Sequence, residues 1–450
     1  MSNTISIRKG LDIRLVGEAT TEIKDIPVSK TVCLSPADFH GLIPKMVVKE
    51  GASVKVGDTV FFDKKNEKIK FVSPASGTIK EIVRAEKRRI VQIIIESDSK
   101  QTCKKFKVKK ISDTTRDEML ELLMESGIWP SVKQRPLDII ADPSNEPKGI
   151  FVSSFDSSPL APDYSFILGE QMEQVQMGLN ALNLLAQGKV HLSSRPNSAF
   201  SKMENVKHHT ITGSHPAGNI GTQIHHIDPV NKGEFVWCMN IQDVAAIGKL
   251  LQTGTVDAKK CIAVTGSEIS SPTYLNIHAG SSMSDILKDN VKGENVRYIS
   301  GNVLTGDQKS IDDYIGYYHN QVTVIPEGNE YKFFLTTGWL GLGFDKFSNS
   351  RLFPTFLLPK SKKFVLDTNT NGEERAFVVT GELEKVFPFD ILPMHLTKAA
   401  ITDDIDGMEN LGIYEVAPED FALCEYVCTT KINIQEKIRQ GLDLIASECM

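Results

Sequence analysis

Three glycines in one short segment could bring backbone amides close to a phosphate group. Gly213, Gly218 and Gly221 lie in TITGSHPAGNIGTQ, and glycine-rich loops that follow strands hold phosphates through their N–H groups. The spacing Gly-x4-Gly-x2-Gly differs from the dinucleotide fingerprint, Pro216 interrupts it, and no P-loop lysine follows. The pattern favours a structural loop, with a flavin- or nucleotide-binding loop as the alternative.

Five histidines follow one another closely and could bind a metal. They are His208, His209, His215, His225 and His226. Neighbouring side chains on a strand point to opposite faces, so the members of an adjacent pair could not easily share one ion. No cysteine or carboxylate stands at the usual ligand spacing. The sequence therefore favours hydrogen-bonded histidines over a metal site.

Cys424 and Cys428 form a C-x3-C pair in ALCEYVC. An iron–sulfur cluster normally uses four thiolates, and two are missing nearby. Residues four apart share one face of a helix, so ordinary burial of both thiols is the favoured interpretation. Seven scattered cysteines in the whole chain are typical of a reducing compartment without a disulfide framework.

Residues 41–83 have the pattern of a small flattened barrel, the kind of domain that carries biotin or lipoyl on a lysine. Turns at Gly51 and Gly57 separate short strands. Alternation predicts one shared face for Val54, Val56, Val60 and Phe62. The matching hairpin tip, 63–68, reads DKKNEK and lacks both acceptor motifs, Met-Lys-Met and Asp-Lys-Ala. We therefore expect the barrel without the swinging arm.

Alternating strands and helices after the barrel predict a parallel sheet. Thr114 or Thr115 can cap a helix that runs to about residue 127. A strand at 149–156, a helix at 169–188 and a strand at 189–193 make a βαβ unit. A further strand turns into a helix that ends at Gly254, and a helical tail begins near Asn433.

The composition is that of an ordinary globular protein. The chain has 450 residues, 40% hydrophobic and 24% charged, with a net charge of −6 that gives no reason to expect nucleic acid. No apolar run reaches the roughly 20 residues of a membrane span, and the N-terminus lacks a signal core. We expect a cytosolic chain, or one peripheral to a membrane on the cytosolic side.

Several stretches together resemble one family over essentially the whole chain. They are IRKGLDIRLVGEA, VVKEGASVKVGDTVFFDKKN, SGIWPSVKQRPL, GSHPAGNIGTQIHHIDPV, VWCMNIQDVAAIG and DFALCEYVC. The sequence resembles the NqrA family of Na+-translocating NADH:quinone reductases. It is more distantly similar to the RnfC component of Rnf complexes and to the flavin-binding peripheral subunit of complex I.

The resemblance implies an α/β multidomain fold with four parts. They are a barrel-sandwich hybrid (biotinyl-like) domain at 1–105, an α/β domain at 106–257, a small SLBB β-grasp domain at 258–310, and a C-terminal domain with a helical tail at 311–450.

The resemblance also implies a role. Such a chain is a peripheral subunit on the cytosolic face of the bacterial inner membrane, in a complex that oxidises NADH, reduces quinone and pumps Na+ outward. It associates with membrane-embedded subunits, contributes to the quinone end and to assembly, and is not catalytic alone. We expect no tightly bound cofactor here, with NADH and flavins on other subunits. The alternatives are a flavin- or NADH-binding subunit that uses Gly213, Gly218 and Gly221, and a ligand-free scaffold.

A quinone site needs a flat apolar slot and one or two hydrogen-bond donors. By their position in the family pattern, two stretches, DFHGLIPKM and GIWPSVKQRP, supply such residues. The candidates are Phe39, His40, Met46, Trp129, Lys133 and Arg135. The alternative is that Phe39 and Trp129 simply pack the barrel against the α/β domain.

Overall fold

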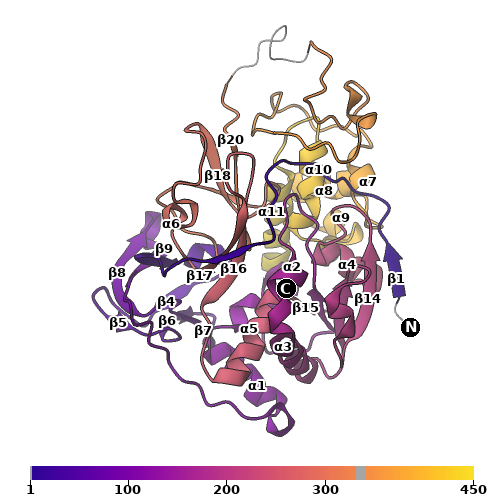
Figure 1. The fold of residues 1–450 in the computed structure, drawn as a ribbon. Helices are drawn as coiled ribbons and strands as arrows, with labels where there is room; N and C mark the ends of the chain where they lie inside the picture. Colours follow the sequence, from indigo (N-terminus) through magenta and orange to yellow (C-terminus); the bar gives the residue numbers. More distant parts are fainter. Residues whose placement is uncertain (1–2, 331–339, 450) are drawn as a thin grey trace.

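Four β-sheets and a group of C-terminal helices make up the part of the chain that the structure describes. The structure is a computed structural model, and it describes residues 3–330 and 340–449 (Figure 1). Two sheets form the N-terminal barrel, one forms the α/β region, and one forms a β-grasp-like region next to the barrel. None of the helices in these two ranges is both long and apolar enough to cross a membrane.

The barrel predicted from the sequence is present. One sheet has the order β3-β9-β8-β5 and the other β4-β6-β7. The strands are β3 (Thr31–Leu34), β4 (Pro44–Met46), β5 (Ser53–Val54), β6 (Thr59–Asp63), β7 (Asn66–Val72), β8 (Gly77–Arg84) and β9 (Ile90–Ser97). The turn between β6 and β7 exposes Lys64 and Lys65, as expected for a solvated hairpin tip.

One detail of the barrel differs from the prediction. Val54, Val56 and Val60 are buried, but in β6 the fully buried ring is Phe61 and not Phe62. The pairing of β6 with β7 shifts register between Thr59 and Phe61. A bulge of this kind turns a neighbouring side chain to the other face, so simple alternation fails there.

The α/β region has a seven-stranded sheet in the order β1-β14-β13-β12-β15-β10-β11. Its first five strands are parallel, and β10 and β11 are antiparallel. The strands are β1 (Asn3–Ser6), β10 (Lys133–Arg135), β11 (Ile139–Ile140), β12 (Ile150–Ser153), β13 (Val190–Ser194), β14 (Lys207–Thr212) and β15 (Val236–Asn240). The predicted parallel sheet is therefore confirmed.

Helices cover both faces of this sheet. The helices are α1 (Arg116–Glu125), α2 (Tyr164–Ile167), α3 (Met172–Leu185), α4 (Ile220–Ile227) and α5 (Ile241–Thr253). α3 and α5 pack side by side over Val152 and Trp237, while Ile224 of α4 packs against Phe151 on the opposite face. The predicted capping box of α1 is present, because Thr115 and Glu118 each accept the other's backbone N–H.

The β-grasp-like sheet has the order β19-β18-β20-β16-β17-β2, with α6 beside it. Its elements are β2 (Ile23–Asp25), β16 (Lys259–Thr265), β17 (Thr273–His278), β18 (Val296–Ser300), β19 (Asp307–Lys309), β20 (Gln321–Pro326) and α6 (Met283–Leu287). β20 lies inside this sheet although it follows residue 310, and β1 and β2 pair outside the barrel although they precede residue 105. The four domain limits remain predictions, and these three strands pair across them.

The C-terminal helices pack on one another and on the edge of the α/β region (Figure 1). They are α7 (Leu383–Val386), α8 (Pro393–Ile401), α9 (Ile405–Asn410), α10 (Ala422–Val427) and α11 (Ile434–Glu448). Asn433 is the N-cap of α11, so the helical tail begins where the sequence predicts. Ile438, Leu442 and Ile445 form its buried stripe.

Candidate functional site

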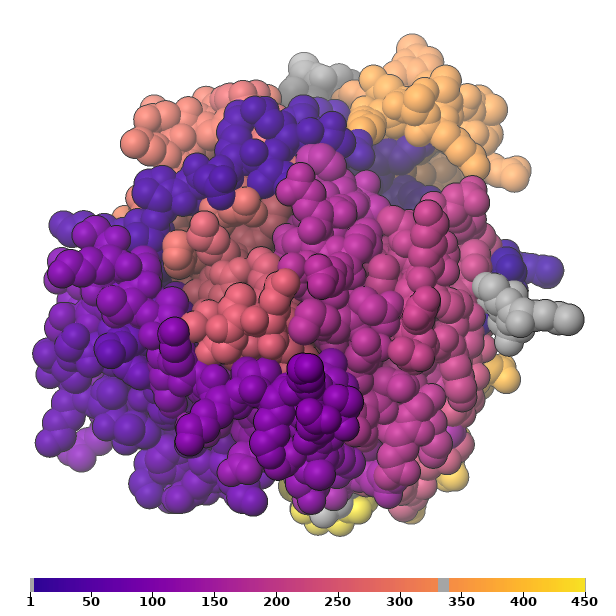
Figure 2. Space-filling model, turned by 60° about the horizontal axis from the view of Figure 1, so that its bottom comes forward, coloured from indigo at the N-terminus to yellow at the C-terminus, as the bar shows by residue number. Residues whose placement is uncertain are grey.

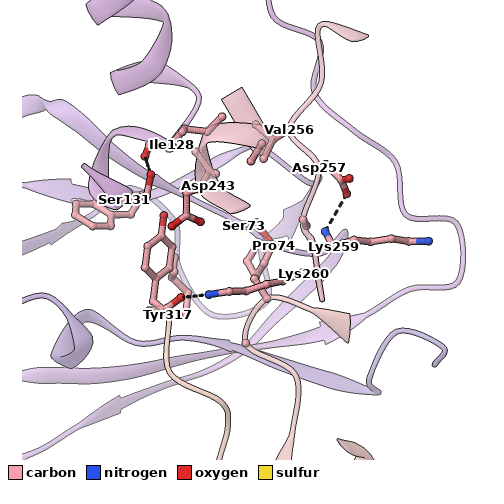
Figure 3. Close-up of a pocket in the computed structure, with 18 of the residues that line it drawn as sticks. Ser73, Pro74, Ile128, Ser131, Asp243, Val256, Asp257, Lys259, Lys260 and Tyr317 are labelled. Carbon is pink, nitrogen blue, oxygen red and sulfur yellow. Dashed lines mark hydrogen bonds between the residues drawn. The ribbon is translucent and has the colours of Figure 1, made fainter. Parts of the chain in front are cut away.

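A cavity lies where the barrel, the α/β region and the β-grasp-like sheet meet (Figure 3). Its volume is about 130 Å³, and it opens to solvent on one side. We call it the junction cavity. Its apolar wall includes Phe71, Val72, Pro74, Ile128, Val256 and Ile315. Its polar side chains include Ser73, Ser131, Gln242, Asp243, Lys260 and Tyr317.

Two charged groups hold the backbone of Tyr317 at this cavity. Lys260 Nζ donates to the Tyr317 carbonyl at 2.8 Å, and Asp38 accepts the Tyr317 N–H at 2.8 Å. The Tyr317 ring points towards Asp243 (Figure 3). The Asp243 carboxylate forms no direct hydrogen bond or ion pair with any described residue but interacts electrostatically with Lys260, and the buried Gln242 Oε1 has no hydrogen-bond partner within 3–330 or 340–449. The cavity thus keeps unused hydrogen-bonding capacity.

Burial shifts both charged side chains towards neutrality. It raises the pKa of Asp243, and Lys260 nearby only partly offsets this. Burial also lowers the pKa of Lys260, with Asp243 as the opposing influence. Asp243 therefore holds its proton to higher pH, and Lys260 releases its proton more readily, than the same groups in water, and shifted groups of this kind concentrate at functional sites.

The two sequence-predicted segments flank this one cavity, but their aromatic residues lie behind its wall. Phe39 is buried, with its ring centroid 4.7 Å from that of Phe71 and 4.8 Å from that of Tyr317. Trp129 is fully buried, packs edge to face on Trp237 at 5.1 Å, and donates its indole N–H to the Ala141 carbonyl. Both rings therefore pack in the core and support the lining rather than form it.

The other four candidates lie apart from the junction cavity. His40 is exposed and pairs with Asp443 at 2.7 Å, and Met46 is half-buried on β4. Lys133 lies at a second cavity, where it pairs with Asp138 at 3.3 Å and sits 4.5 Å from the centre of the Tyr318 ring. Arg135 is fully buried in a cluster of ion pairs.

The second cavity lies at the carboxyl ends of the parallel strands, the usual place for a ligand in an α/β sheet. Its lining is acidic, with the carboxyl groups of Asp138, Asp156, Asp243 and Glu419. The opposing cations are few. Lys133 is one, and burial lowers the pKa of His215 and so disfavours its charged form. Lys133 is already paired with Asp138, and the nearby Arg135 with Glu419, so these cations are engaged and not available to the phosphate of a flavin or a nucleotide.

The space around the glycine segment beside this cavity is filled by other residues of the chain. A Cβ at Gly221 would lie 2.4 Å from Asp420 Oδ1 and 2.7 Å from Arg135 Nη1. At Gly218 it would lie 2.4 Å from the backbone nitrogen of Ser157, whose hydroxyl accepts the Gly218 N–H. Gly213 has φ +125° and lies against the Ile7 carbonyl. These close approaches use the space that a phosphate would need.

The side chains over Gly221 belong to a buried ion-pair cluster. Arg135 Nη1 lies 2.5 Å from Asp420 Oδ2, and Arg135 Nη2 lies 2.8 Å from Glu419 Oε1. Arg135 also donates to the Glu415 carbonyl at 3.2 Å. The cluster joins the seven-stranded sheet to the turn before α10, so Arg135 has a structural partner in place of a ligand.

All five histidines form hydrogen bonds, as predicted. His208 bonds to the Met203 carbonyl, His209 to His191 at 3.0 Å, and His215 to Ser157. The expected strand is wrong for the other pair, since His225 and His226 lie on α4, where the glycine segment leads into a helix. There His225 bonds to Glu415 and His226 to the Thr222 carbonyl. No group of three His, Cys, Asp or Glu side chains in the described ranges suits a metal ion.

Cys424 and Cys428 are both buried, but they do not share a helix face. α10 ends at Val427, and Cys428 already has an extended conformation. Its sulfur lies 3.0 Å from Thr430 Oγ1, while the Cys424 sulfur faces the Leu383 carbonyl. Burial raises the pKa of the Cys424 thiol well above its usual value, so it stays protonated.

Sequence reasoning missed Asp243, Lys260 and Tyr317. Asp243 looks like an ordinary first-turn acid of α5, and Lys260 looks like a strand-end lysine. Only the packing of three sheets brings them to one cavity, so the local sequence carried no signal for them.

Known proteins resemble this chain along its length. Family models match at 5–98 (NqrA N-terminal barrel-sandwich hybrid domain), 114–256 (NqrA second alpha/beta domain) and 261–310 (NQRA C-terminal domain). The NqrA protein of the Na(+)-translocating NADH-quinone reductase from a Marinomonas species is 37% identical, over 98% of this chain and 99% of the relative. Its counterpart from Haemophilus influenzae is 38% identical, over 99% of this chain and all of the relative.

A solved structure of an NAD+-reducing [NiFe]-hydrogenase overlaps 41% of each chain at 14% identity and a TM-score of 0.30, which is too low to support an argument. The two sequence relatives suffice, because each is well above 30% identical over nearly its whole length. The chain belongs to the NqrA family of the Na+-translocating NADH-quinone reductases.

Proposed function

We propose that this chain is a peripheral, cytosol-facing subunit of a bacterial membrane complex that oxidises NADH, reduces quinone and exports Na+. Its relatives carry the name of such a complex. In this proposal the chain binds to membrane-embedded subunits and contributes to assembly and to the quinone end. NADH and flavins are held by other subunits.

The junction cavity is the observation that carries the quinone part of this proposal. Phe71, Pro74 and Ile128 give the cavity an apolar wall. On the other side, Lys260, and Asp243 in its protonated form, can donate hydrogen bonds to the carbonyl oxygens of a quinone. Lys260 uses one N–H on the Tyr317 carbonyl and keeps two others. The quinone ring would lie between the apolar wall and these donors.

Quinone reduction consumes two protons as well as two electrons, and the cavity offers groups suited to supply them. Burial raises the pKa of the Asp243 carboxyl, so it keeps its proton to higher pH, and lowers the pKa of the Lys260 ammonium, so it releases its proton more readily. In this proposal Phe39 and Trp129 act as supports, since they fix Tyr317 and the 128–131 turn from behind.

The absence of a redox group on this chain is also part of the proposal. The Arg135–Asp420 pair covers Gly221, and the cavity beside it is acidic. These features count against the alternative of a flavin or NADH site at Gly213, Gly218 and Gly221.

The test uses the assembled complex with Lys260→Met in this chain. We expect the KM for quinone to rise about tenfold, the effect of losing one well-placed hydrogen bond to a charged donor. NADH oxidation with a soluble artificial electron acceptor should stay unchanged. The matched control is Lys45→Met on β4, which removes an exposed lysine of the neighbouring barrel.

A photoreactive quinone analogue gives an independent readout. We expect it to label peptides containing residues 71–74 and 127–131, with protection by excess quinone. Unchanged KM together with labelling confined to other subunits would contradict the quinone part and leave a ligand-free scaffold.

A further inference from the structure

The segment 340–365, which we call the apolar–basic lobe, exposes an unusual number of large apolar side chains. Seven of the fifteen such residues found exposed in the described ranges lie in it. They are Leu340, Leu342, Phe344, Leu352, Phe356, Leu357 and Val365. Leu342, Leu352 and Leu357 are 78%, 75% and 73% exposed. Exposed apolar side chains that gather in one segment usually mark an interaction site.

The same lobe is strongly basic. It contains one acidic residue, Asp345, and five basic ones, so its net charge is +4, whereas the whole chain carries −6. The basic residues are Lys346, Arg351, Lys360, Lys362 and Lys363. Some of them lie over aromatic rings of the lobe, as Arg351 does over Phe356 at 5.7 Å. Cationic and apolar side chains therefore alternate along this segment, and one of the cations, Lys363, is paired with Glu18 outside it.

The lobe is attached firmly on its inner side. Phe364 is only 2% exposed, and the Arg14 guanidinium lies 5.2 Å from the centre of its ring. Arg14 Nη1 also donates to the Pro359 carbonyl at 2.6 Å. The one regular element within 340–365 is the short 3-10 helix η7 (Pro354–Phe356). Figure 2 shows this part of the chain, in orange, protruding at one corner of the molecule.

We propose that the apolar–basic lobe binds an anionic lipid surface. Leucine and phenylalanine tips insert at the boundary between headgroups and acyl chains, and the interleaved lysines and arginines meet the anionic headgroups. A protein interface is the weaker explanation, because lysine is depleted from the cores of such interfaces. This inference does not depend on the quinone site, which lies on other elements.

The test is co-flotation of the full purified chain with vesicles of phosphatidylcholine, with and without phosphatidylglycerol. We expect binding to the anionic vesicles, little binding to the neutral ones, and weakening by added salt. The variant L352S/L357S should reduce binding about tenfold, because two apolar tips no longer insert. The control I43S/V47S removes two exposed apolar residues of the barrel and should bind as the wild type does.

A second readout guards against variants that simply misfold. In F356W the new indole should shift its emission to the blue when anionic vesicles are added, and in V47W it should not. Equal binding by L352S/L357S and wild type, or no spectral shift in F356W, would overturn the proposal. It would also be overturned if the wild type ignores vesicles while L352S/L357S fails to assemble with the membrane subunits, since the lobe would then be a protein interface.

Discussion

Two groups of half-buried and buried charges in this chain differ in how their members are paired. Around Gly221, Arg135 contacts Asp420 and Glu419 directly, at 2.5 and 2.8 Å. At the junction cavity, Lys260 bonds directly only to a carbonyl, and Asp243 interacts with Lys260 electrostatically without a direct ion pair. The first group lies under a loop whose sequence suggests a ligand, and the second lies where the sequence suggests none.

This contrast means that glycine spacing alone does not distinguish a ligand site from a structural contact. A paired buried charge already has the electrostatic partner that it needs, so removing one member is costly. An unpaired charge beside a cavity is destabilised where it stands and keeps bonding capacity for a ligand. Four substitutions can test whether the two groups behave as these opposite kinds.

The largest effect should come from Arg135→Met. Asp420 would be left buried without its cation, so we expect the free energy of unfolding to fall by about 3–5 kcal/mol. Denaturant unfolding of the purified chain measures this. Lys385→Met, which breaks an exposed pair with Glu382, should cost less than about 1 kcal/mol. A loss of similar size in both variants would remove the distinction between the two groups of charges.

Gly221→Ala should have the next largest effect, and its sign is informative. Alanine favours a helix over glycine by about 1 kcal/mol, so it would stabilise α4 if the space beside it were empty. Because Asp420 and Arg135 occupy that space, we expect a loss of about 2–3 kcal/mol instead. Gly169→Ala is the control, since nothing lies within 4 Å of its Cβ position. A stabilised Gly221→Ala variant would reopen the phosphate-loop interpretation.

Lys260→Met should change stability by no more than about 1 kcal/mol, because the lost hydrogen bond to the Tyr317 carbonyl is offset by the lost burial penalty of the ammonium. Thermal and denaturant unfolding at neutral pH measure the change. The expected change is therefore much smaller than that of Arg135→Met. A loss above about 2 kcal/mol would mean that Lys260 is a paired structural residue as well.

The smallest effect is the pH dependence of Asp243→Asn. Burial raises the folded-state pKa of Asp243, so the folded wild type binds this proton more tightly than the unfolded chain. The contribution of Asp243 to the stability of the wild type is fully present below the pKa of aspartate in the unfolded chain, about 3.9. It is lost as pH rises through the pKa of Asp243 in the folded chain. We therefore expect Asp243→Asn to gain up to about 1 kcal/mol over the wild type as pH rises to neutrality. If the free energies of unfolding of the two proteins changed with pH in the same way, this prediction would be contradicted.

Much of the fold was predictable because it depends on local patterns. The capping box at Thr115, the end of α5 at Gly254 and the N-cap at Asn433 follow from a few neighbouring residues each. The face of β6 was not predictable, because a bulge depends on the partner strand. The helix that carries His225 and His226 was also missed, since the glycines before it resemble a loop.

Residue order alone was enough to specify the family, the barrel, the parallel sheet and the helical tail. Each of these depends on periodicity, motifs and turn chemistry within short windows. The packing of distant elements was needed to show that Asp420, 199 residues after Gly221, fills the glycine segment, and that Lys260 and Asp243 face an open cavity. The physical reason is that pairing of buried charges depends on which distant elements pack together, and no local pattern records that packing.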